Sequence, residues 1–515
     1  MGSALRQKGA LYAMACVALA ILAIATATAA QAPASADTAP VTLSAAPLGV
    51  NTAPWDYFYS VPGSAAVMQS LLKAAGVRQL RYGGGEYADA YDWQLNANID
   101  NCLPDNATAP FTSSCASSDA LNFSLFSRQA RAIGAQSLVT VNYGSGTPAL
   151  AKAWVKQAST PGRAVALWEI GNENYGCWEV NNELAGPPEH YKLYVPGIHT
   201  SNGDNPTCPP VTQGVAAGIQ TLATSYAVNA KRFMIAMKVA NPAAQIGVPW
   251  AFGSEVRGAS VADNTEWNNT VLGADAKYIS FVDVHYYPYG FSGSTGGPSS
   301  PTDQQVLQSL QQIPALDAEI RNELNAYDPT ASVVVGETAV SGAPNMTTCT
   351  PVGALFAAGD VLSWLALGAK SVDWWDMDSY GNTGSRCVRP DNGFFTSSAK
   401  PVAETPYYGY ALASVLAQPH AQLGTLDTSD PADVLAFQSV LPGGQQAVAF
   451  INTNISSAET VTFTAPLAGT LRTWRYSAAN QNLANSKIVK GTTPATSFAA
   501  GITLPPESMT ILQTT

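Results

Sequence analysis

Short apolar runs, rich in β-branched and aromatic residues, recur from residue 48 to residue 374, with stretches of helical spacing between them. The runs occupy residues 48–51, 79–82, 137–142, 167–170, 245–248, 281–284, 332–335 and 371–374. Runs this continuous are typical of parallel strands that are buried on both faces of a sheet. We therefore expect eight parallel strands in this part of the chain.

The stretches between these runs place apolar residues three or four positions apart, as an amphipathic helix requires. Helical candidates include residues 226–239, 306–324 and 355–367. Alternating strand and helix units predict an α/β fold, a (β/α)8 TIM barrel with long inserted loops, over residues 45–410. A doubly wound open sheet is the alternative, but the chain lacks the glycine-rich phosphate-binding motif that often marks one.

The pattern changes after residue 410. Apolar and polar residues now alternate, as in Ala447-Val-Ala-Phe-Ile451 and Glu459-Thr-Val-Thr-Phe-Thr464, and clusters of Asn, Gly and Pro separate these segments. Alternation of this kind indicates strands with one buried and one exposed face. The pattern predicts a C-terminal antiparallel β-sandwich over residues 411–515.

Residues 1–36 have the pattern of a secretory signal peptide. Arg6 and Lys8 precede an uncharged apolar run, and small residues follow it, with candidate cleavage after Ala30 or Ala36. An uncleaved anchor is the alternative, but the leucine-containing part is short for a bilayer span. We expect a secreted protein, extracellular or periplasmic, with no membrane association after cleavage.

Composition and charge narrow the classes of partner. Of the 515 residues, 46% are hydrophobic and only 12% are charged, so uncharged polar residues must solvate most of the surface. The 36 Asp and Glu residues outnumber the 25 Lys and Arg residues, which leaves a formal net charge of −11. The sequence contains no basic run or Arg–aromatic stripe, and nucleic acid is therefore a poor candidate partner.

The cysteines are interpreted as disulfide partners. Without Cys16 of the signal segment, six remain: Cys102, Cys115, Cys177, Cys208, Cys349 and Cys387. An even number in an exported chain favours disulfide bonds, and we expect sequential pairs that each close one polar loop. A metal site is the alternative, but the chain has no CxxC motif and its four histidines are scattered. We expect no metal.

In a (β/α)8 barrel, catalytic residues lie at the carboxyl ends of the strands. The residues at these ends are Arg81, Asn142, Asn172, Glu173, Trp250, His285, Tyr287, Glu337, Trp374 and Trp375. So many polar residues after apolar strands indicate a common site. Two of them, Glu173 and Glu337, follow the fourth and seventh strands.

Paired carboxylates are what glycoside hydrolysis requires: one attacks the anomeric carbon, and the other protonates the leaving oxygen. The fourth and seventh strands of a barrel face each other across its mouth, so a separation near about 5 Å, the retaining geometry, is feasible. Glu169 points the other way along the fourth strand and is interpreted as a structural partner. This chemistry needs no cofactor, and we expect none.

Three motifs resemble those of known glycoside hydrolases. Trp168-Glu-Ile-Gly-Asn-Glu173 resembles the strand-four signature of clan A retaining enzymes. Leu80-Arg-Tyr-Gly-Gly-Gly-Glu-Tyr-Ala-Asp-Ala-Tyr-Asp-Trp93 and Ile279-Ser-Phe-Val-Asp-Val-His-Tyr-Tyr287 are similar to motifs of family 51 α-L-arabinofuranosidases. Residues 336–342 look more like family 79 β-glucuronidases and heparanases. Gly83 and Glu86 replace a proline and an asparagine that are usual in family 51, so sugar contacts there can differ.

The resemblance implies a role for each matching residue. Glu173 would be the acid/base and Glu337 the nucleophile. Asn172 would bond the sugar 2-hydroxyl group, while Arg81 and Tyr287 would keep Glu337 ionised and oriented. The remaining residues that would contact the sugar are His285, Trp375 and Glu86.

Aromatic residues in predicted loops form a further group of candidates: Tyr57, Tyr59, Tyr175, Trp178, Trp267 and Tyr289. They either pack the loops or stack on sugar rings. Trp178, beside Glu173, is the best candidate for stacking. The segment between Cys177 and Cys208 would form a stapled loop over the site.

These observations predict a secreted retaining glycoside hydrolase that binds a polysaccharide or oligosaccharide. We expect an α-L-arabinofuranosidase acting on side chains. A β-D-glucuronidase or a β-xylosidase is the alternative within the same chemistry. A non-catalytic carbohydrate-binding or cell-surface protein is the alternative of another class, although such proteins usually lose one glutamate and both are present here.

Overall fold

The computed structural model describes residues 39–98, 119–176, 179, 215–251, 261–289, 301–341, 350–379, 392–477 and 488–515. The predicted signal segment and all seven cysteines lie outside these residues, so secretion and disulfide pairing stay predictions. Within the described part of the chain, we find no helix with both the length and the apolar character that a membrane span needs.

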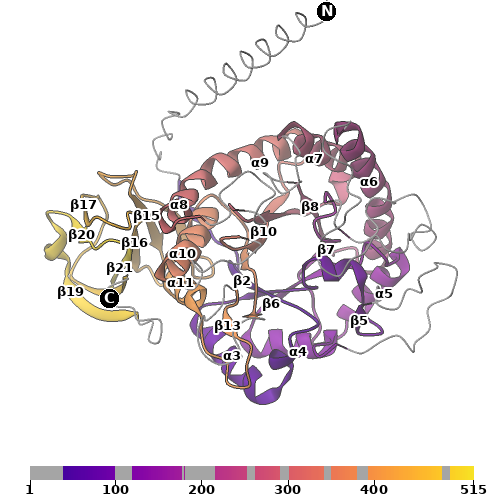
Figure 1. Ribbon diagram of the computed structural model, residues 1–515, viewed down its shortest axis with the longest axis horizontal. Helices are drawn as coiled ribbons and strands as arrows, with labels where there is room; N and C mark the ends of the chain where they lie inside the picture. Colours follow the sequence, from indigo (N-terminus) through magenta and orange to yellow (C-terminus); the bar gives the residue numbers. More distant parts are fainter. Residues whose placement is uncertain are drawn as a thin grey trace, which may run out of the picture. The chain divides into compact units, whose positions relative to one another are not determined.

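Eight parallel strands close into a barrel (Figure 1). In order around the barrel they are β2 (Leu48–Thr52), β3 (Gln79–Tyr82), β6 (Gln136–Val141), β7 (Leu167–Ile170), β8 (Gln245–Trp250), β9 (Phe281–Tyr286), β10 (Ser332–Thr338) and β11 (Val372–Trp374). Pairing of β11 with β2 closes the ring. All eight predicted strands are present, and the (β/α)8 barrel is confirmed.

Helices form a ring outside the strands (Figure 1). They are α2 (Tyr57–Ser60), α3 (Pro62–Ala74), α4 (Phe123–Ile133), α5 (Pro148–Ala158), α6 (Val215–Ala240), α7 (Val261–Asp275), α8 (Asp303–Ser309), α9 (Ile313–Tyr327), α10 (Pro351–Ala366) and α11 (Thr405–Ala413). The loop after β3 forms a short 3-10 helix, η1 (Gly85–Ala90), and the small pair β4 (Tyr91–Asp92) and β5 (Ala97–Asn98) follows it. A second small pair, β12 (Asp378–Ser379) and β13 (Phe395–Thr396), follows β11.

The helix boundaries follow from local sequence. Asn122 caps α4 by accepting a hydrogen bond from the Leu125 amide, and Gly134 ends that helix in the left-handed region. The single helix expected over residues 306–324 is wrong, because the chain forms α8 and α9 separated by a 3-10 turn. Pro314 explains the break: without an amide hydrogen it suits the first turn of a helix and disrupts the interior.

Side chains of the barrel strands alternate between two environments. The residues that point outward, such as Val139, Trp168 and Val282, belong to the large apolar core shared with the helices. The inward residues Leu138, Leu167, Phe281 and Val334 form a separate small apolar cluster. Two residues further along each of these strands, the inward positions become polar or glycine. The barrel interior therefore changes from apolar to charged along its axis.

The C-terminal region is an antiparallel sheet of seven strands. Their order is β1 (Val41–Thr42), β14 (Gln422–Thr425), β15 (Val434–Val440), β16 (Gln446–Asn452), β21 (Ser508–Thr514), β18 (Thr470–Ser477) and β19 (Val489–Pro494). The pair β17 (Glu459–Val461) and β20 (Ile502–Leu504) forms a second, smaller layer. The predicted antiparallel C-terminal sheet is confirmed, but its edge strand β1 comes from before the barrel, outside the predicted boundaries.

The two faces of this large sheet pack against different partners. Ile451 and Ile511 belong to the main core together with residues of the barrel helices, and Ser439 donates a hydrogen bond of 2.9 Å to the Leu416 carbonyl after α11. The opposite face contributes Val448 and Phe450 to a second apolar cluster that includes the residues of β17 and β20. One continuous core thus joins the barrel to the sheet.

Candidate active site

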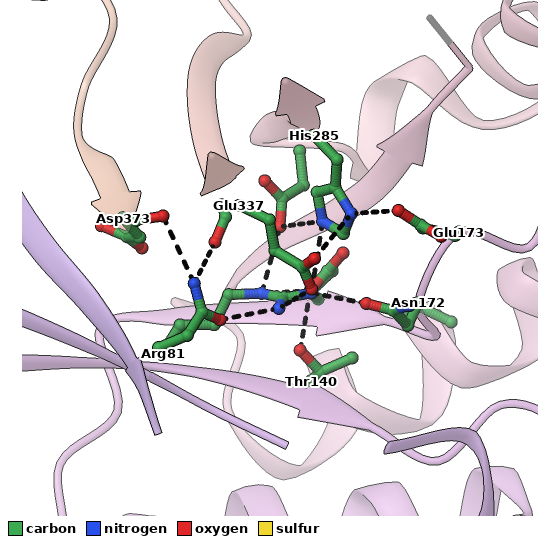
Figure 2. A network of polar contacts seen from close by, with 12 residues as sticks. Arg81, Thr140, Asn172, Glu173, His285, Glu337 and Asp373 are labelled. Carbon is green, nitrogen blue, oxygen red and sulfur yellow. Dashed lines mark hydrogen bonds and ion pairs between the residues drawn. The ribbon is translucent and has the colours of Figure 1, made fainter. Parts of the chain in front are cut away.

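Arg81 is the centre of the polar network inside the barrel (Figure 2). It lies on β3, and its side chain is fully buried. Its Nη1 donates to Oε1 of Glu337 at 2.7 Å and to Oδ1 of Asn51 at 2.9 Å. Nε and Nη2 both donate to Oε2 of Glu169, at 3.1 and 2.9 Å. One guanidinium group therefore connects the second, fourth and seventh barrel strands.

The charge of Arg81 depends on its acidic neighbours. Burial by itself would lower the pKa of the guanidinium, but the charges of Glu169, Glu337 and Asp283 outweigh it and raise that pKa well above its usual value. Arg81 therefore stays protonated. A planar group with five donors suits this place, because it can bind two carboxylates at once.

Glu337 lies on β10, where the register with β9 shifts between Val335 and Glu337. The shift aligns Glu337 with His285 of β9. Oε1 of Glu337 accepts the bond from Arg81, and Oε2 accepts a bond of 2.7 Å from the Tyr287 hydroxyl. A cation and a hydroxyl donor both favour an anionic carboxylate. The contacts expected for Arg81 and Tyr287 are therefore present.

Glu173 follows β7 in a turn of unusual backbone geometry. Gly171 has φ +72°, and Glu173 itself has φ +43°. Oε1 of Glu173 lies 2.8 Å from Nδ1 of His285, and that nitrogen is 3.5 Å from Oε2 of Glu337. A carboxylate oxygen of Glu173 lies within 4.8 Å of one of Glu337. Figure 2 shows the imidazole of His285 between the two glutamates.

The protonation of His285 results from opposing effects. Burial lowers the pKa of the imidazole, while the charge of Glu337 and hydrogen bonds to Asp283 and Glu173 raise it, so that the pKa lies well above its usual value. His285 is therefore protonated near neutral pH. Its Nδ1 then donates to Glu173, so a proton is present beside the group expected to act as the acid.

Asn172 precedes Glu173 and is buried. Its Oδ1 accepts a bond of 2.9 Å from Arg81, and its Nδ2 donates to Oε1 of Glu179 at 3.2 Å. Its backbone amide donates to Oδ2 of Asp89 at 3.2 Å. Both polar atoms of the Asn172 side chain are therefore hydrogen-bonded, and these bonds fix its orientation next to the two glutamates.

A second layer of carboxyl groups lies beneath the first. Glu169 accepts from Arg81 at 2.9 Å and from the Thr140 hydroxyl at 2.7 Å. The expectation that it points away from the site is therefore wrong, because it binds the same arginine as Glu337, although these contacts fit a structural partner. Asp283 lies 3.4 Å from Nε of Arg81. Burial raises the pKa of Glu169 to about 8, and burial also raises the pKa of Asp373 well above its usual range. Both groups therefore bind a proton at a higher pH than an exposed carboxyl group does.

The remaining residues predicted at the strand ends and in the loops do not all join this network. Glu86 is half-buried in η1, and Trp375 packs against Gly85, where a Cβ atom would lie 3.0 Å from the indole ring. Trp178 lies outside the described residues. Asn142 does not join the site: its Oδ1 accepts from the Ser145 and Gly146 amides of its own loop.

Two of the aromatic residues expected in loops around the mouth lie in helices instead. Tyr59 belongs to α2 and Trp267 to α7, and both are fully buried, so the loop positions expected for them are wrong. Tyr175 does lie in the loop after β7, where it is buried with its ring 6.2 Å from that of Trp267. That sugars stack on Tyr175 stays a prediction. Tyr57 is 59% exposed on α2, and Tyr289 is partly buried.

Some residues of the network were not predicted from the sequence. Asp283 lies two positions before His285 on β9, so the two-residue period of a strand could have placed both on the inner face. Asp89 and Glu179 come from loops after different strands. Only the folded chain brings them to Asn172.

Solved structures share this architecture. The α-L-arabinofuranosidase of Thermotoga maritima, in an arabinose complex, is 16% identical, with a TM-score of 0.62 over 92% of this chain and 98% of that one. A family 51 α-L-arabinofuranosidase from Bifidobacterium longum is 15% identical, with a TM-score of 0.64 over 93% of this chain and 98% of that one. A 4-O-α-L-rhamnosyl-β-D-glucuronidase from Fusarium oxysporum is 16% identical, with a TM-score of 0.56 over 93% and 98% of the two chains.

No protein-family model matches the sequence, and no curated protein matches it either. The likeness to the solved structures extends over nearly the whole chain. The motifs indicate a resemblance to clan A enzymes, and the structure has the same fold as these enzymes. The chain has the fold of these glycosidases, a (β/α)8 barrel followed by an antiparallel sheet. At this identity the comparison establishes the fold alone.

Proposed function

We propose that this protein is a retaining glycoside hydrolase. The observation that carries the proposal is the approach of Glu173 and Glu337, whose carboxylate oxygens come within 4.8 Å of each other. Retaining enzymes separate their two carboxyl groups by about 5–5.5 Å, whereas inverting enzymes need about 6.5–9.5 Å to admit a water molecule. The spacing supports a double displacement.

Each glutamate has surroundings that suit one step. Glu337, held by Arg81 and Tyr287, attacks the anomeric carbon while the bond from that carbon to the leaving oxygen breaks. Glu173, which shares a hydrogen bond with His285, gives a proton to the leaving oxygen. Glu173 then accepts a proton from water, whose oxygen attacks the anomeric carbon and releases Glu337. Asn172 contacts the sugar 2-hydroxyl group.

For the substrate we propose an α-L-arabinofuranoside on a polysaccharide or oligosaccharide. The motifs after the second and sixth strands support this choice, and so does the likeness to two solved α-L-arabinofuranosidases. The charges around the two glutamates also favour a neutral sugar, because a uronate would need a cation that is free to bind its carboxylate. Among the described residues, the cations that contact the two glutamates are Arg81 and His285, and both are already paired with carboxylates.

A β-D-glucuronidase is the second candidate. It is favoured by residues 336–342 and by the likeness to a solved rhamnosyl-glucuronidase. A β-xylosidase follows within the same chemistry. Export from the cell remains part of the proposal, and its support is the pattern of residues 1–36. A non-catalytic carbohydrate-binding protein is disfavoured, because such a protein would not need to retain the contacts of both glutamates.

The test is hydrolysis of five aryl glycosides: α-L-arabinofuranoside, β-D-xyloside, β-D-glucuronide, β-D-galactoside and β-D-glucoside. We expect wild type to cleave the arabinofuranoside and Glu337→Gln to lose on the order of 10³-fold or more in kcat. Glu319→Gln, an exposed change on α9, is the matched control. Proton NMR of the first product should show retained anomeric configuration.

The outcomes separate the alternatives. Cleavage of the glucuronide alone would replace the proposed substrate and keep the mechanism. Equal activity of wild type and Glu337→Gln would contradict the role of Glu337. Binding of arabino-oligosaccharides without any hydrolysis would support a carbohydrate-binding protein instead.

A further inference from the structure

A second pair of acidic residues lies beside the acid/base turn. Asp89 belongs to η1, after the second barrel strand, and Glu179 follows the fourth. Both are buried, and both bind Asn172: Asp89 accepts from its backbone amide and Glu179 accepts from its Nδ2. Oε2 of Glu179 is buried, and no hydrogen-bond donor of the described residues reaches it. Two buried carboxyl groups that share a neighbour, one of them with an oxygen that lacks a donor, favour one shared proton over two negative charges.

Asp89 contacts the residues on both sides of Glu173. Its Oδ2 accepts from the backbone amide of Asn172 at 3.2 Å and from Nδ2 of Asn174 at 2.7 Å. Its Oδ1 accepts from the Tyr143 amide at 3.1 Å, in the loop after the third barrel strand. An ionised carboxylate can accept all of these bonds at once. Asp89 thus attaches the turn around Glu173 to a neighbouring loop.

This turn needs to be held. Glu173 has φ +43°, a region that residues with a side chain rarely adopt. Such a conformation persists when the surroundings determine it. Gly171, with φ +72°, leaves the space that Asn174 fills: a Cβ atom on Gly171 would lie 1.9 Å from Oδ1 of Asn174. Because Asn174 fits there, its Nδ2 can reach Asp89.

Glu179 extends the same arrangement to Asn172, whose Nδ2 donates to Oε1 of Glu179 at 3.2 Å. The acidic groups that face Glu179 are Asp89, Glu86 and Glu173. Burial raises the pKa of Glu179 well above its usual range, and the charges of these three neighbours raise it further. Burial raises the pKa of Asp89 to about 6. The shared proton therefore resides on Glu179.

We propose that Asp89 and Glu179 form a proton-sharing carboxyl pair that positions Asn172 and Glu173 for proton transfer to the leaving oxygen. Both act through other residues and are positioning residues. The inference rests on the proposed glycosidase function. It adds that proton transfer from Glu173 depends on a protonated Glu179. Glutamine has the shape and the donor of a protonated glutamate, so it can replace Glu179, whereas alanine cannot.

The test compares Glu179→Gln with Glu179→Ala on two aryl glycosides of the sugar that wild type cleaves. One carries a 4-nitrophenyl leaving group, which needs little protonation, and the other a 4-methylphenyl group, which needs more. We expect Glu179→Ala to lose about tenfold in kcat on the 4-methylphenyl substrate and less than about threefold on the 4-nitrophenyl substrate. Glu179→Gln should stay within about threefold of wild type on both. Glu173→Ala, which removes the acid/base itself, shows the largest dependence on the leaving group that can be expected. Exposed Glu319→Gln is the control.

Equal losses on both substrates, or a Glu179→Gln protein as impaired as Glu179→Ala, would overturn the proposal. If Glu179→Ala does not fold, Asn174→Ala removes the 2.7 Å bond to Asp89 and should show the same dependence on the leaving group. If wild type cleaves no glycoside, the proposed function fails by itself. The pair is then tested by infrared spectroscopy at neutral pH: subtracting the spectrum of Glu179→Gln from that of wild type should leave a protonated-carboxyl band that belongs to Glu179. Absence of that band would overturn the shared proton.

Discussion

The interior of the barrel has two layers with opposite character. Near the amino ends of β6, β7, β9 and β10, the inward residues are apolar: Leu138, Leu167, Phe281 and Val334. Two positions further along, the same strands carry Thr140, Glu169, Asp283 and Gly336. Gly336 has no side chain, and a Cβ atom there would lie 2.1 Å from Oδ1 of Asp283. We call these sets the lower layer and the upper layer.

The difference teaches how one scaffold separates stability from chemistry. The lower layer contributes apolar burial, which stabilises the fold without directional demands. The upper layer holds buried carboxyl groups around Arg81, and buried charges give little net stability even when they are paired. It does, however, position Glu337. If this division is right, substitutions in the lower layer should change the free energy of unfolding but not kcat, whereas substitutions in the upper layer should change kcat as well.

The largest effect is expected for Arg81→Met in the upper layer. The change leaves Glu169, Glu337 and Asp283 buried without their cation, and loss of one partner of a buried ion pair costs about 3–5 kcal/mol. Urea denaturation measures the free energy of unfolding. Activity should fall as well, on the order of 10²–10³-fold, because Glu337 loses its cationic donor and keeps only the neutral Tyr287 hydroxyl of the two at 2.7 Å. A stable, active Arg81→Met protein would contradict the central place of Arg81.

The next effect is expected for Leu167→Ala in the lower layer. A cavity in a packed apolar cluster costs about 2–5 kcal/mol. The kcat of the folded protein should change by less than about threefold, because the upper layer and its contacts stay intact. Stability is measured by urea denaturation, and kcat under conditions where the variant is folded. A large loss of kcat at full folding would show that the two layers are not separable.

The pH dependence of stability distinguishes the layers further. The pKa of Glu169 is raised to about 8 in the folded protein, whereas a glutamate in an unfolded chain has a pKa of about 4.3. Between these values the folded state binds the extra proton, so the free energy of unfolding falls as pH rises, by at most about 1.4 kcal/mol per pH unit. Glu169→Gln should remove this part of the slope. Glu319→Gln, which removes an exposed carboxyl group with a smaller rise in pKa, should change the slope much less. Equal slopes for wild type and Glu169→Gln would argue against the raised pKa of Glu169.

The smallest effect is expected for an ion pair outside both layers. Arg321 binds Asp317 at 3.1 Å on α9, and its side chain is 35% exposed. Asp317 is buried, and Arg321 also donates to the Leu367 carbonyl at 2.9 Å, but solvent reaches the arginine. Loss of this pair should therefore cost about 1–2 kcal/mol, between the values of an exposed pair and of a fully buried one. Arg321→Ala, followed by thermal denaturation, should cost less than Arg81→Met. A comparable cost for both would mean that burial does not set the value of these arginines.

Much of the fold could be predicted because its signals are local. Continuous apolar runs are visible in the sequence, and all eight barrel strands begin within one residue of the predicted position. Helix breaks are less visible: the division between α8 and α9 depends on Pro314 inside an otherwise helical pattern. The edge strand β1 was not predicted, because two residues carry no periodicity and their partner, β14, is distant in the sequence.

The sequence by itself determined which residues stand at the ends of the barrel strands, since strand position and two-residue alternation are local properties. That was enough to select Glu173 and Glu337 and to expect Arg81 and Tyr287 beside Glu337. The chemistry of a pair of carboxylates could therefore be proposed from the chain alone.

Only the tertiary structure decided how these residues share protons and charges. The contacts of Asp283 with Arg81, of His285 with both glutamates, and of Asp89 with Glu179 join segments that are far apart in the chain. The pKa of each group depends on burial and on neighbouring charge, and neither exists before the chain closes into the barrel. For this reason the sequence could name the reacting groups, while their protonation had to come from the fold.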